Sequence, residues 1–296
     1  MGAIVALDAA LRDVREGSDG LQRVSTAHDS ARALIQSRPD GSLYLLVYQA
    51  GQTKEKYSAS HAMLSMLVCE LAAPLLDWSA EHVNAVGRAA LLMNVAMLGL
   101  QDRLAASEVT LTAELRAQIA DHGAKGASML AEAGLADELV IEAVRLHHDD
   151  STAARALAEL AAGQRLARLL RRVDIFTAKL SRRASRKPMS PVQAAREACL
   201  GQRGVPDEIG AALLKAVGLY PPGSFVELVS GEVAIVLARG SRANLPRVAS
   251  LLNAGGKPLN EPALRDTVDQ RHAIKCAFPQ GYARTRPPHD KLLAMR

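Results

Sequence analysis

The apolar residues of this chain recur at intervals of three and four through most of residues 1–218, the spacing that places them on one face of a helix. Alanine and leucine are frequent, and the clearest interruptions are the turn-forming stretches RPDG at 38–41 and LYPPG at 219–223. The pattern predicts a helical body with helices near residues 3–15, 21–37, 42–50, 58–76, 79–99, 111–120, 123–133, 136–148, 152–181, 190–201 and 206–217.

The pattern changes after Gly223, where SFVELVSGEVAIVLARG contains two β-branched runs separated by Ser230 and Gly231. This arrangement is typical of a β-hairpin. Beyond Pro279 the chain is basic and contains prolines, and we expect this tail to be loose. The expected organisation is an N-terminal helical segment over residues 1–50, a helical domain over 51–222, and a β-hairpin with a basic tail over 223–296.

The composition favours a cytoplasmic protein. The 296 residues include three cysteines with no CxxC spacing, which predicts reduced thiols rather than disulfides or a zinc site. The N-terminus has no basic leader, and the longest apolar runs, such as residues 89–100, are shorter than the roughly 18 to 20 residues that a membrane span needs. We therefore expect no membrane span.

Charge is distributed unevenly along the chain. Residues 1–164 carry 13 basic and 21 acidic residues, a balance of −8, whereas 165–296 carry 23 and 10, a balance of +13. Nine basic residues lie between Arg165 and Lys187, with Asp174 as the only acidic one, so this segment could attract an anion. Aromatic residues make up only 3% of the chain and no DNA-reading motif is present, so we do not expect DNA binding.

Four histidines lie within or at the ends of predicted helices, and an aspartate lies in a further one. Imidazoles and carboxylates that converge from facing helices are ligands for Zn, Mn or Fe. The alternative is that these residues only form hydrogen bonds in a helix interface, as most single histidines do. The candidates are His61, His122, His147, His148 and Asp174.

In their order and context these residues resemble the HD-GYP family of bacterial cyclic di-GMP phosphodiesterases over roughly residues 50–240. The similar segments are EKYSASHAMLSMLVCELA, LTAELRAQIADHGAKGASML, RLHHDD, RLARLLRRVDIFTAKLSRRASRKPMSPVQAAREA and LYPPGSFVELVSGEVAIVLA. The resemblance implies an all-α, HD-type helical bundle with a small C-terminal β-hairpin region. It also implies that the five residues above are metal ligands and that nucleotide phosphates are bound by Arg183, Arg186 and Lys187.

The chain departs from the family where the HD dyad is expected. Met93 and Asn94 replace this His-Asp pair, and Met97 stands at the position of the lysine that follows it. In the family the Asp bridges two metal ions, and the bridged ions activate the water that attacks phosphorus. A neutral amide bridges metal ions poorly, and a thioether suits soft ions. The GYP loop is also missing, and we expect continuous helix in its place.

The departures favour a catalytically impaired signalling protein that acts by binding cyclic di-GMP or a signalling protein partner. One divalent ion (Zn, Mn or Fe) on His122, His147 and His148 is compatible with this hypothesis, as is a homodimer. An active metal-dependent phosphodiesterase with an atypical site and a pure interaction scaffold are the alternatives. Met93 and Met97 are expected to pack in the core, and the amide of Asn94 to form a hydrogen bond with His61 or Asp174.

Overall fold

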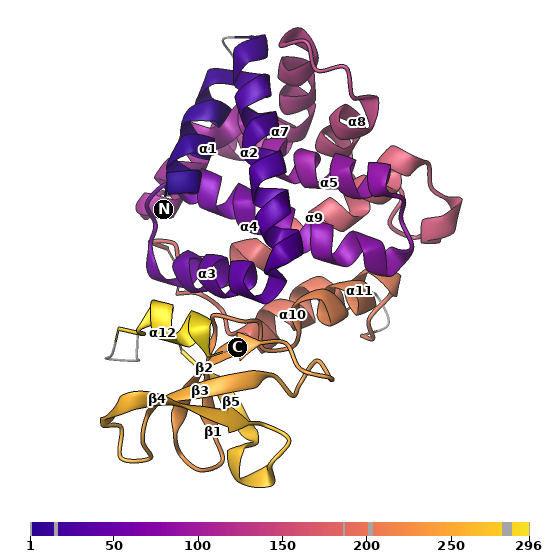
Figure 1. The fold of residues 1–296 in the computed structure, drawn as a ribbon. Coiled ribbons are helices and arrows are strands. Elements are labelled where there is room, and N and C mark those ends of the chain that lie inside the picture. Colours follow the sequence, from indigo (N-terminus) through magenta and orange to yellow (C-terminus); the bar gives the residue numbers. More distant parts are fainter. Residues whose placement is uncertain (1, 15–16, 186, 201–203, 280–285, 296) are drawn as a thin grey trace.

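The helical body is confirmed by the computed structural model, in which twelve α-helices are found among the described residues (Figure 1). They are α1 (Gly2–Asp13), α2 (Ser18–Ser37), α3 (Pro39–Gln52), α4 (Tyr57–Ala72), α5 (Ala80–Leu92), α6 (Leu98–Ala106), α7 (Ala113–Glu132), α8 (Glu138–Leu146), α9 (Ala162–Leu180), α10 (Pro191–Cys199), α11 (Glu208–Val217) and α12 (His289–Ala294). The structure describes residues 2–14, 17–185, 187–200, 204–279 and 286–295.

Helix α4 forms the centre of the bundle and contacts α3, α5, α9 and α11. Almost all of its side chains are buried, including Leu64, Met66 and Leu67. A helix that is apolar on every side is stable in water only when other helices surround it. His61 is therefore held in the interior of the protein rather than on its surface.

Two stretches of the chain are long and apolar enough to resemble membrane spans by length and composition alone. They are Tyr57–Leu76 and Ala80–Ala106, the second of which is interrupted by a short 3₁₀ segment. In this fold 72% and 61% of their most apolar windows are buried inside the protein. Packing within the bundle accounts for their composition.

The helix expected over 79–99 is broken in the structure. Helix α5 ends at Leu92, Met93 and Asn94 form a turn, and a 3₁₀ segment (Val95–Met97) leads into α6. Asn94 has φ −107° and ψ 13°, which lies outside the α-helical region. Asparagine adopts such backbone conformations readily, because its short polar side chain favours turns over helix. Conversely, the two helices expected over 111–120 and 123–133 form the single helix α7.

The expectation that continuous helix replaces the GYP loop is wrong. Helix α9 begins only at Ala162, and residues 149–161 form turns and a short 3₁₀ helix (Leu157–Glu159). Asp149 accepts hydrogen bonds from the backbone N–H and the hydroxyl of Ser151, which stabilises a turn in place of a helix.

The C-terminal region is a five-stranded antiparallel sheet rather than an isolated hairpin, so the all-α expectation covers only the helical body. The expected hairpin is present, with Phe225 opposite Ile235 and Gly231 at φ 81° in its turn. The sheet order is β4-β3-β2-β1-β5. The strands are β1 (Phe225–Leu228), β2 (Val233–Ala238), β3 (Arg247–Leu252), β4 (Pro258–Asp266) and β5 (Ile274–Phe278).

Part of the tail expected to be loose is folded. Residues 280–285 lie outside the described residues, but α12 follows them and buries Leu292 against the sheet core. The Nδ1 atom of His289 lies 2.9 Å from the hydroxyl oxygen of Tyr44 on α3, within hydrogen-bonding distance. Tertiary packing therefore orders a segment whose composition suggested disorder.

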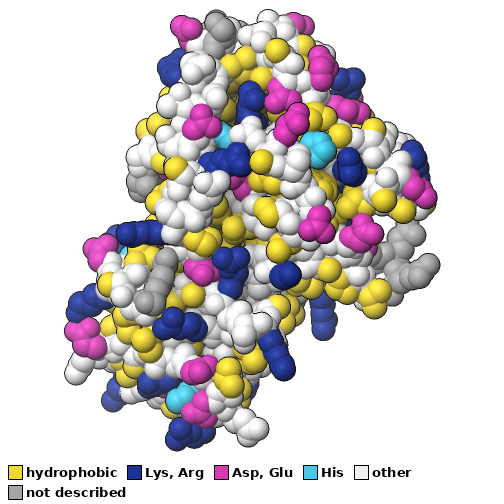
Figure 2. Space-filling model, turned by 45° about the vertical axis from the view of Figure 1, so that its right-hand side comes forward, with side chains coloured by type: hydrophobic (Ala, Val, Ile, Leu, Met, Phe, Trp, Pro, Cys, Tyr) yellow, Lys and Arg dark blue, Asp and Glu magenta, His cyan; other side chains and the backbone are white. Residues whose placement is uncertain are grey.

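The sheet lies against α3 of the helical body (Figure 1). Gly223 has φ 91°, and a Cβ atom at this position would lie 2.3 Å from the carbonyl oxygen of Tyr44, so only glycine fits. Arg239 on the sheet side forms an ion pair of 2.6 Å with Asp40. Figure 2 shows Lys and Arg side chains scattered among Asp and Glu on one face of the molecule, not gathered into one basic field.

Candidate metal centre

Three imidazoles meet where α7 passes the end of α8. His122 lies on α7, His147 caps the C-terminus of α8, and His148 follows it. The ring centroids are 4.9 Å apart for His122 with either neighbour and 4.2 Å apart for His147 and His148. One nitrogen from each ring lies within 4.8 Å of the others. The structure thus brings together three of the residues that the sequence indicated as metal ligands.

Gly123 allows the two helices to approach at this point. A Cβ atom there would lie 3.0 Å from the carbonyl oxygen of Val144 and 3.4 Å from Cε1 of His147. A side chain would push α7 away from the end of α8 and separate His122 from His147. The sequence analysis missed this role, although a glycine directly after a histidine inside a helical pattern is a signal for close backbone approach.

The two buried imidazoles are oriented by backbone carbonyls. Nδ1 of His122 donates to the carbonyl oxygen of Ile119 at 2.5 Å, and Nδ1 of His147 donates to that of Val144 at 2.7 Å. In the neutral form each ring then has a lone pair on Nε2. These two Nε2 atoms face each other at 3.0 Å.

Two lone pairs at this distance repel unless a proton or a cation lies between them. Burial, and next the neighbouring His148, lowers the pKa of His147 to about 3, so a proton on its Nε2 is unfavourable at neutral pH. Nitrogen ligands at about 2.0 to 2.1 Å from one shared ion lie about 3.0 to 3.4 Å apart. The histidines therefore fit a divalent metal ion, with carbonyl partners that orient the ligands as in known metal sites.

His61 and Asp174 form a second, separate pair. Nε2 of His61 donates to Oδ1 of Asp174 at 2.8 Å, joining α4 to α9. His61 is buried and Asp174 is half-buried. The nitrogen that His61 would offer to a metal ion is thus engaged by the carboxylate.

Asp174 also interacts electrostatically with His147 and His148 of the three-histidine cluster. Burial alone would raise its pKa, but the hydrogen bond from His61 and the attraction of His61, His147 and His148 outweigh burial and hold the pKa well below its usual range. Asp174 is therefore ionised at neutral pH. Its charge acts on the three-histidine cluster in turn, because it favours the charged forms of His147 and His148.

Met93 and Asn94 are both buried, but only Met93 makes the contacts expected of it. Met93 is 0% exposed and packs in the core as expected, whereas Met97 is half-buried. Asn94 is 4% exposed, and its Nδ2 has no hydrogen-bond partner in the described part of the chain. The expected hydrogen bond from its amide to His61 or Asp174 is therefore wrong.

One of the predicted phosphate-binding residues contacts the site through an aromatic ring. Arg183 donates from Nε and Nη2 to the hydroxyl of Tyr57 at 2.9 and 2.5 Å, and the Tyr57 ring stacks on His61 at a centroid distance of 5.7 Å. Lys187 is exposed, and Arg186 lies outside the described residues. Tyr57, which the sequence analysis did not single out, links the basic segment to the histidines.

The chain is thus a helical bundle protein with an appended antiparallel sheet and a candidate metal site of three imidazoles. Over 266 residues the chain is 28% identical to the cyclic di-GMP phosphodiesterase PA4108 of Pseudomonas aeruginosa, an alignment that covers 86% of this chain and 62% of that protein. This is a distant homology, and the chain spans about three fifths of the relative's length. No family model matches the chain, and no solved structure matches it.

Proposed function

We propose that the chain is a catalytically impaired HD-GYP-like signalling protein that binds cyclic di-GMP at its histidine centre without hydrolysing it at a significant rate. The proposal rests on the motifs shared with that family and on the distant homology to a cyclic di-GMP phosphodiesterase. It extends to one divalent ion held by His122, His147 and His148.

The observation that carries the proposal is the neutral, buried Met93-Asn94 turn beside an otherwise preserved set of imidazoles. Two adjacent cations repel strongly and need a shared negative ligand between them. The only carboxylate among the candidate ligands is Asp174, and it is hydrogen-bonded to His61. The candidate ligands are thus proposed to hold one cation, because Asp174, the only carboxylate among them, is engaged by His61 and does not bridge a second one.

A bound divalent ion would supply attraction for a phosphate oxygen. The protein would supply the remaining contacts from Arg183, whose guanidinium is held beside the site by Tyr57 and matches two phosphate oxygens at once. The hydrogen bond to Asp174 holds the His61 ring in place, and the Tyr57 ring stacks on it at an interplanar angle of 9°. This arrangement favours ground-state binding over chemistry.

The test is a calorimetric titration with cyclic di-GMP, followed by chromatography for the linear product. We expect saturable binding and no detectable product with added Mn²⁺. Arg183→Gln should weaken binding about 10- to 100-fold, because a hydrogen bond to a charged group contributes about 1.5 to 3 kcal/mol. Arg116→Gln, on an exposed part of α7, is the matched control and should leave the affinity unchanged.

The double substitution Met93→His and Asn94→Asp restores the dyad and should produce measurable hydrolysis. Turnover by the natural chain at per-second rates would contradict the proposed impairment and support an active phosphodiesterase. Absence of any cyclic di-GMP binding would contradict the proposed ligand and favour the scaffold alternative.

A further inference from the structure

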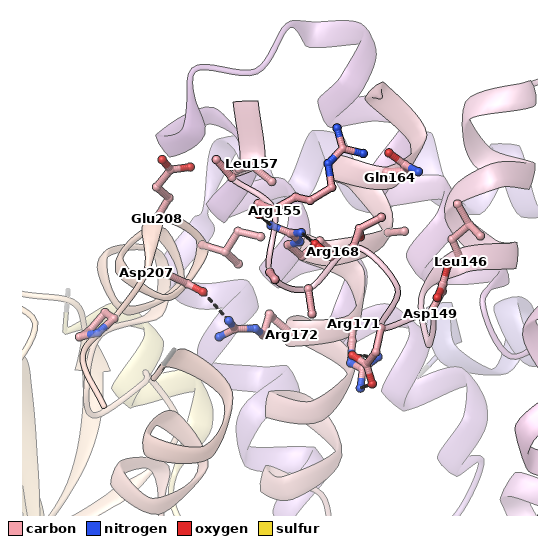
Figure 3. A pocket seen from close by; sticks show the side chains of 18 of the residues that line it. Leu146, Asp149, Arg155, Leu157, Gln164, Arg168, Arg171, Arg172, Asp207 and Glu208 are labelled. Atoms are coloured by element: carbon pink, nitrogen blue, oxygen red, sulfur yellow. Dashed lines mark hydrogen bonds and ion pairs between the residues drawn. The ribbon is translucent and has the colours of Figure 1, made fainter. Parts of the chain in front are cut away.

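A cavity in the described part of the chain lies beside the histidine centre rather than in it. It has a volume of about 580 Å³ and lies between residues 149–157, α9 and the start of α11. None of the candidate metal ligands lines it, and neither Tyr57 nor Arg183 does. Figure 3 shows Arg155 and Arg168 in its middle, with Asp207 and Glu208 on one side and Leu146 and Asp149 on the other.

Four arginines line the cavity, and they differ in how their charges are neutralised. Arg171 forms an ion pair of 2.7 Å with Asp150, and Arg172 forms an ion pair with Asp207. Arg155 lies 3.9 Å from the exposed carboxylate of Glu159, a contact that contributes little, and its Nη2 donates to the backbone carbonyl oxygen of Glu159 at 2.6 Å. Two of the four guanidinium charges are thus neutralised locally.

Arg168 has no carboxylate partner among the described residues. Its guanidinium donates to the backbone carbonyl oxygens of Thr152 and Arg155, which carry no net charge. Burial, together with the repulsion of Arg172 and Arg155, opposes its charge more than Asp207 and Glu208 support it and lowers its pKa. A guanidinium nevertheless remains protonated at neutral pH, so this half-buried charge lacks a counterion.

The carboxylates that line the cavity do not fill this role. Asp150 and Asp207 belong to the two ion pairs, and Asp207 also accepts from the backbone N–H of Gly210 as the N-cap of α11. Asp149 accepts two hydrogen bonds from Ser151. Glu208 is exposed at the rim. The lining carries four arginines and four acidic residues, so its formal charge is balanced, but no carboxylate among the described residues pairs with Arg168 and only the distant Glu159 pairs with Arg155.

The rest of the lining is largely apolar and includes Ala154, Leu157, Ala167 and Ile209. Small-molecule sites commonly have volumes of about 300 to 1,000 Å³ and combine an apolar wall with a few placed polar groups. Two adjacent guanidinium groups match a phosphate monoester, which carries close to two negative charges and accepts hydrogen bonds from each fork. A carboxylate would neutralise only one of them.

We infer that this cavity is a binding site for a small phosphate monoester of mononucleotide size, with its phosphate on Arg155 and Arg168 and its body against the apolar wall. This inference goes beyond the proposed function and does not depend on it, because the cavity shares no residue with the histidine centre. The turns of residues 149–161, which occupy the position where the sequence predicted helix, form one wall of the site.

The experiment is a calorimetric titration of the full chain with AMP, with adenosine as the uncharged control. AMP should bind saturably and adenosine should not. Arg168→Met should weaken AMP binding about 10- to 100-fold. Arg165→Met, which removes a charge from the same helix outside the cavity, should leave the affinity unchanged.

Arg168 also holds the backbone of residues 152–155, so a second variant separates binding from folding. Ala154→Phe leaves all four arginines in place but fills the cavity, and it should also abolish AMP binding while the thermal unfolding temperature stays close to that of the natural chain. No AMP binding by the natural chain at millimolar concentration would overturn the inference, and so would AMP binding by Arg168→Met and Ala154→Phe that is as tight as that of the natural chain. Competition by saturating cyclic di-GMP would place AMP at the histidine centre and would overturn it equally.

Discussion

At the scale of single residues, the chemistry of the centre follows from which nitrogen of each histidine carries a proton. The carbonyl oxygens of Ile119 and Val144 hold the Nδ1 protons of His122 and His147. The Nε2 lone pairs therefore face each other in a buried site that disfavours protonation of His147. A metal ion bound between these two nitrogens would remove the repulsion.

This protonation state predicts how the stability of the metal-free protein depends on pH. The pKa of His147 is about 3 in the folded protein and about 6.5 in the unfolded chain. Below pH 6.5 the unfolded chain therefore binds the proton and the folded protein does not, so the free energy of unfolding falls as pH falls. The contribution is about 1.4 kcal/mol per pH unit, or about 2 kcal/mol between pH 6.5 and 5.

Urea denaturation of the metal-free protein at several pH values measures this effect. The His147→Gln variant should show a shallower decline in the free energy of unfolding than the natural chain over this pH range. His82→Gln, at a half-buried position on α5 outside the three-histidine cluster, is the control and should keep the original slope. Identical slopes for His147→Gln and the natural chain would show that His147 is not buried in its neutral form.

The sequence indicated the three histidines but not their geometry. Adjacent side chains on a helix diverge by about 100°, and His147 and His148 come together only because α8 ends at Leu146. The prediction for Asn94 was wrong, because its amide was expected to form a hydrogen bond with His61 or Asp174 and does not. The turn at Met93 and Asn94 removes this side chain from the continuous helix assumed in that expectation.

At the scale of helices, the N-terminal segment is attached to the bundle by a buried polar contact. His28 on α2 and Glu70 on α4 are joined by a hydrogen bond of 2.9 Å, and both are buried. Arg32 lies 3.6 Å from the same carboxylate. Helix α5 covers this pair with Gly87, which leaves room for both side chains.

Gly87→Ala should therefore destabilise the protein. The added Cβ atom would lie 2.4 Å from Oε1 of Glu70 and 3.0 Å from Nε2 of His28, so the pair or α5 must shift. Overpacking of this kind costs about 1 to 3 kcal/mol of unfolding free energy. Gly99→Ala on α6 meets no atom within 4 Å and should be neutral or slightly stabilising. Chemical denaturation of both variants decides, and equal stability of the two would contradict the packing described.

The apolar spacing of the sequence predicted which helices are present. It did not predict where they end, because the ends depend on local hydrogen bonds. The start of α9 was misplaced because Ala-rich residues 153–162 have helical propensity, yet Asp149 and Arg168 stabilise turns there through hydrogen bonds to Ser151 and to backbone carbonyls. These contacts come partly from a distant residue. Propensity alone does not contain that information.

At the scale of the whole molecule, the sheet and the helical body are joined through α3 and α12. His289 on α12 lies against the rings of Tyr44 and Tyr48, with centroid distances of 5.7 and 4.5 Å. Leu292 on the same helix packs with Tyr44 and the sheet residue Phe225. The last helix of the chain thus connects the first helices to the sheet.

Tyr44→Phe should weaken this connection by removing the hydrogen bond to His289. We expect a loss of about 0.5 to 1.5 kcal/mol in the free energy of unfolding, with faster proteolytic cleavage near residues 218–224. Tyr48→Phe is the matched control, because its hydroxyl has no hydrogen-bond partner among the described residues, and it should have little effect. Equal effects of the two substitutions would contradict the role of the His289 contact.

The helical body could be predicted from the sequence because it rests on repeated local spacing. The sequence predicted two strands of the five-stranded sheet, because only β1 and β2 carry the alternating, β-branched pattern of a hairpin. Strand β4 is an edge strand, partly exposed and rich in polar residues, and its pairing with β3 is set by the tertiary structure. The burial of α12 likewise depends on a surface formed by distant residues.

The account as a whole depends on one ion at the histidine centre and no bridged second ion. The most direct measurement is the number of metal ions per chain, determined by elemental analysis after dialysis against Mn²⁺ or Zn²⁺ and removal of free metal. We predict one ion per chain, and none in a His122→Ala, His147→Ala double variant. Two ions per chain in the natural protein would show that another carboxylate bridges them and would contradict the proposed loss of catalysis.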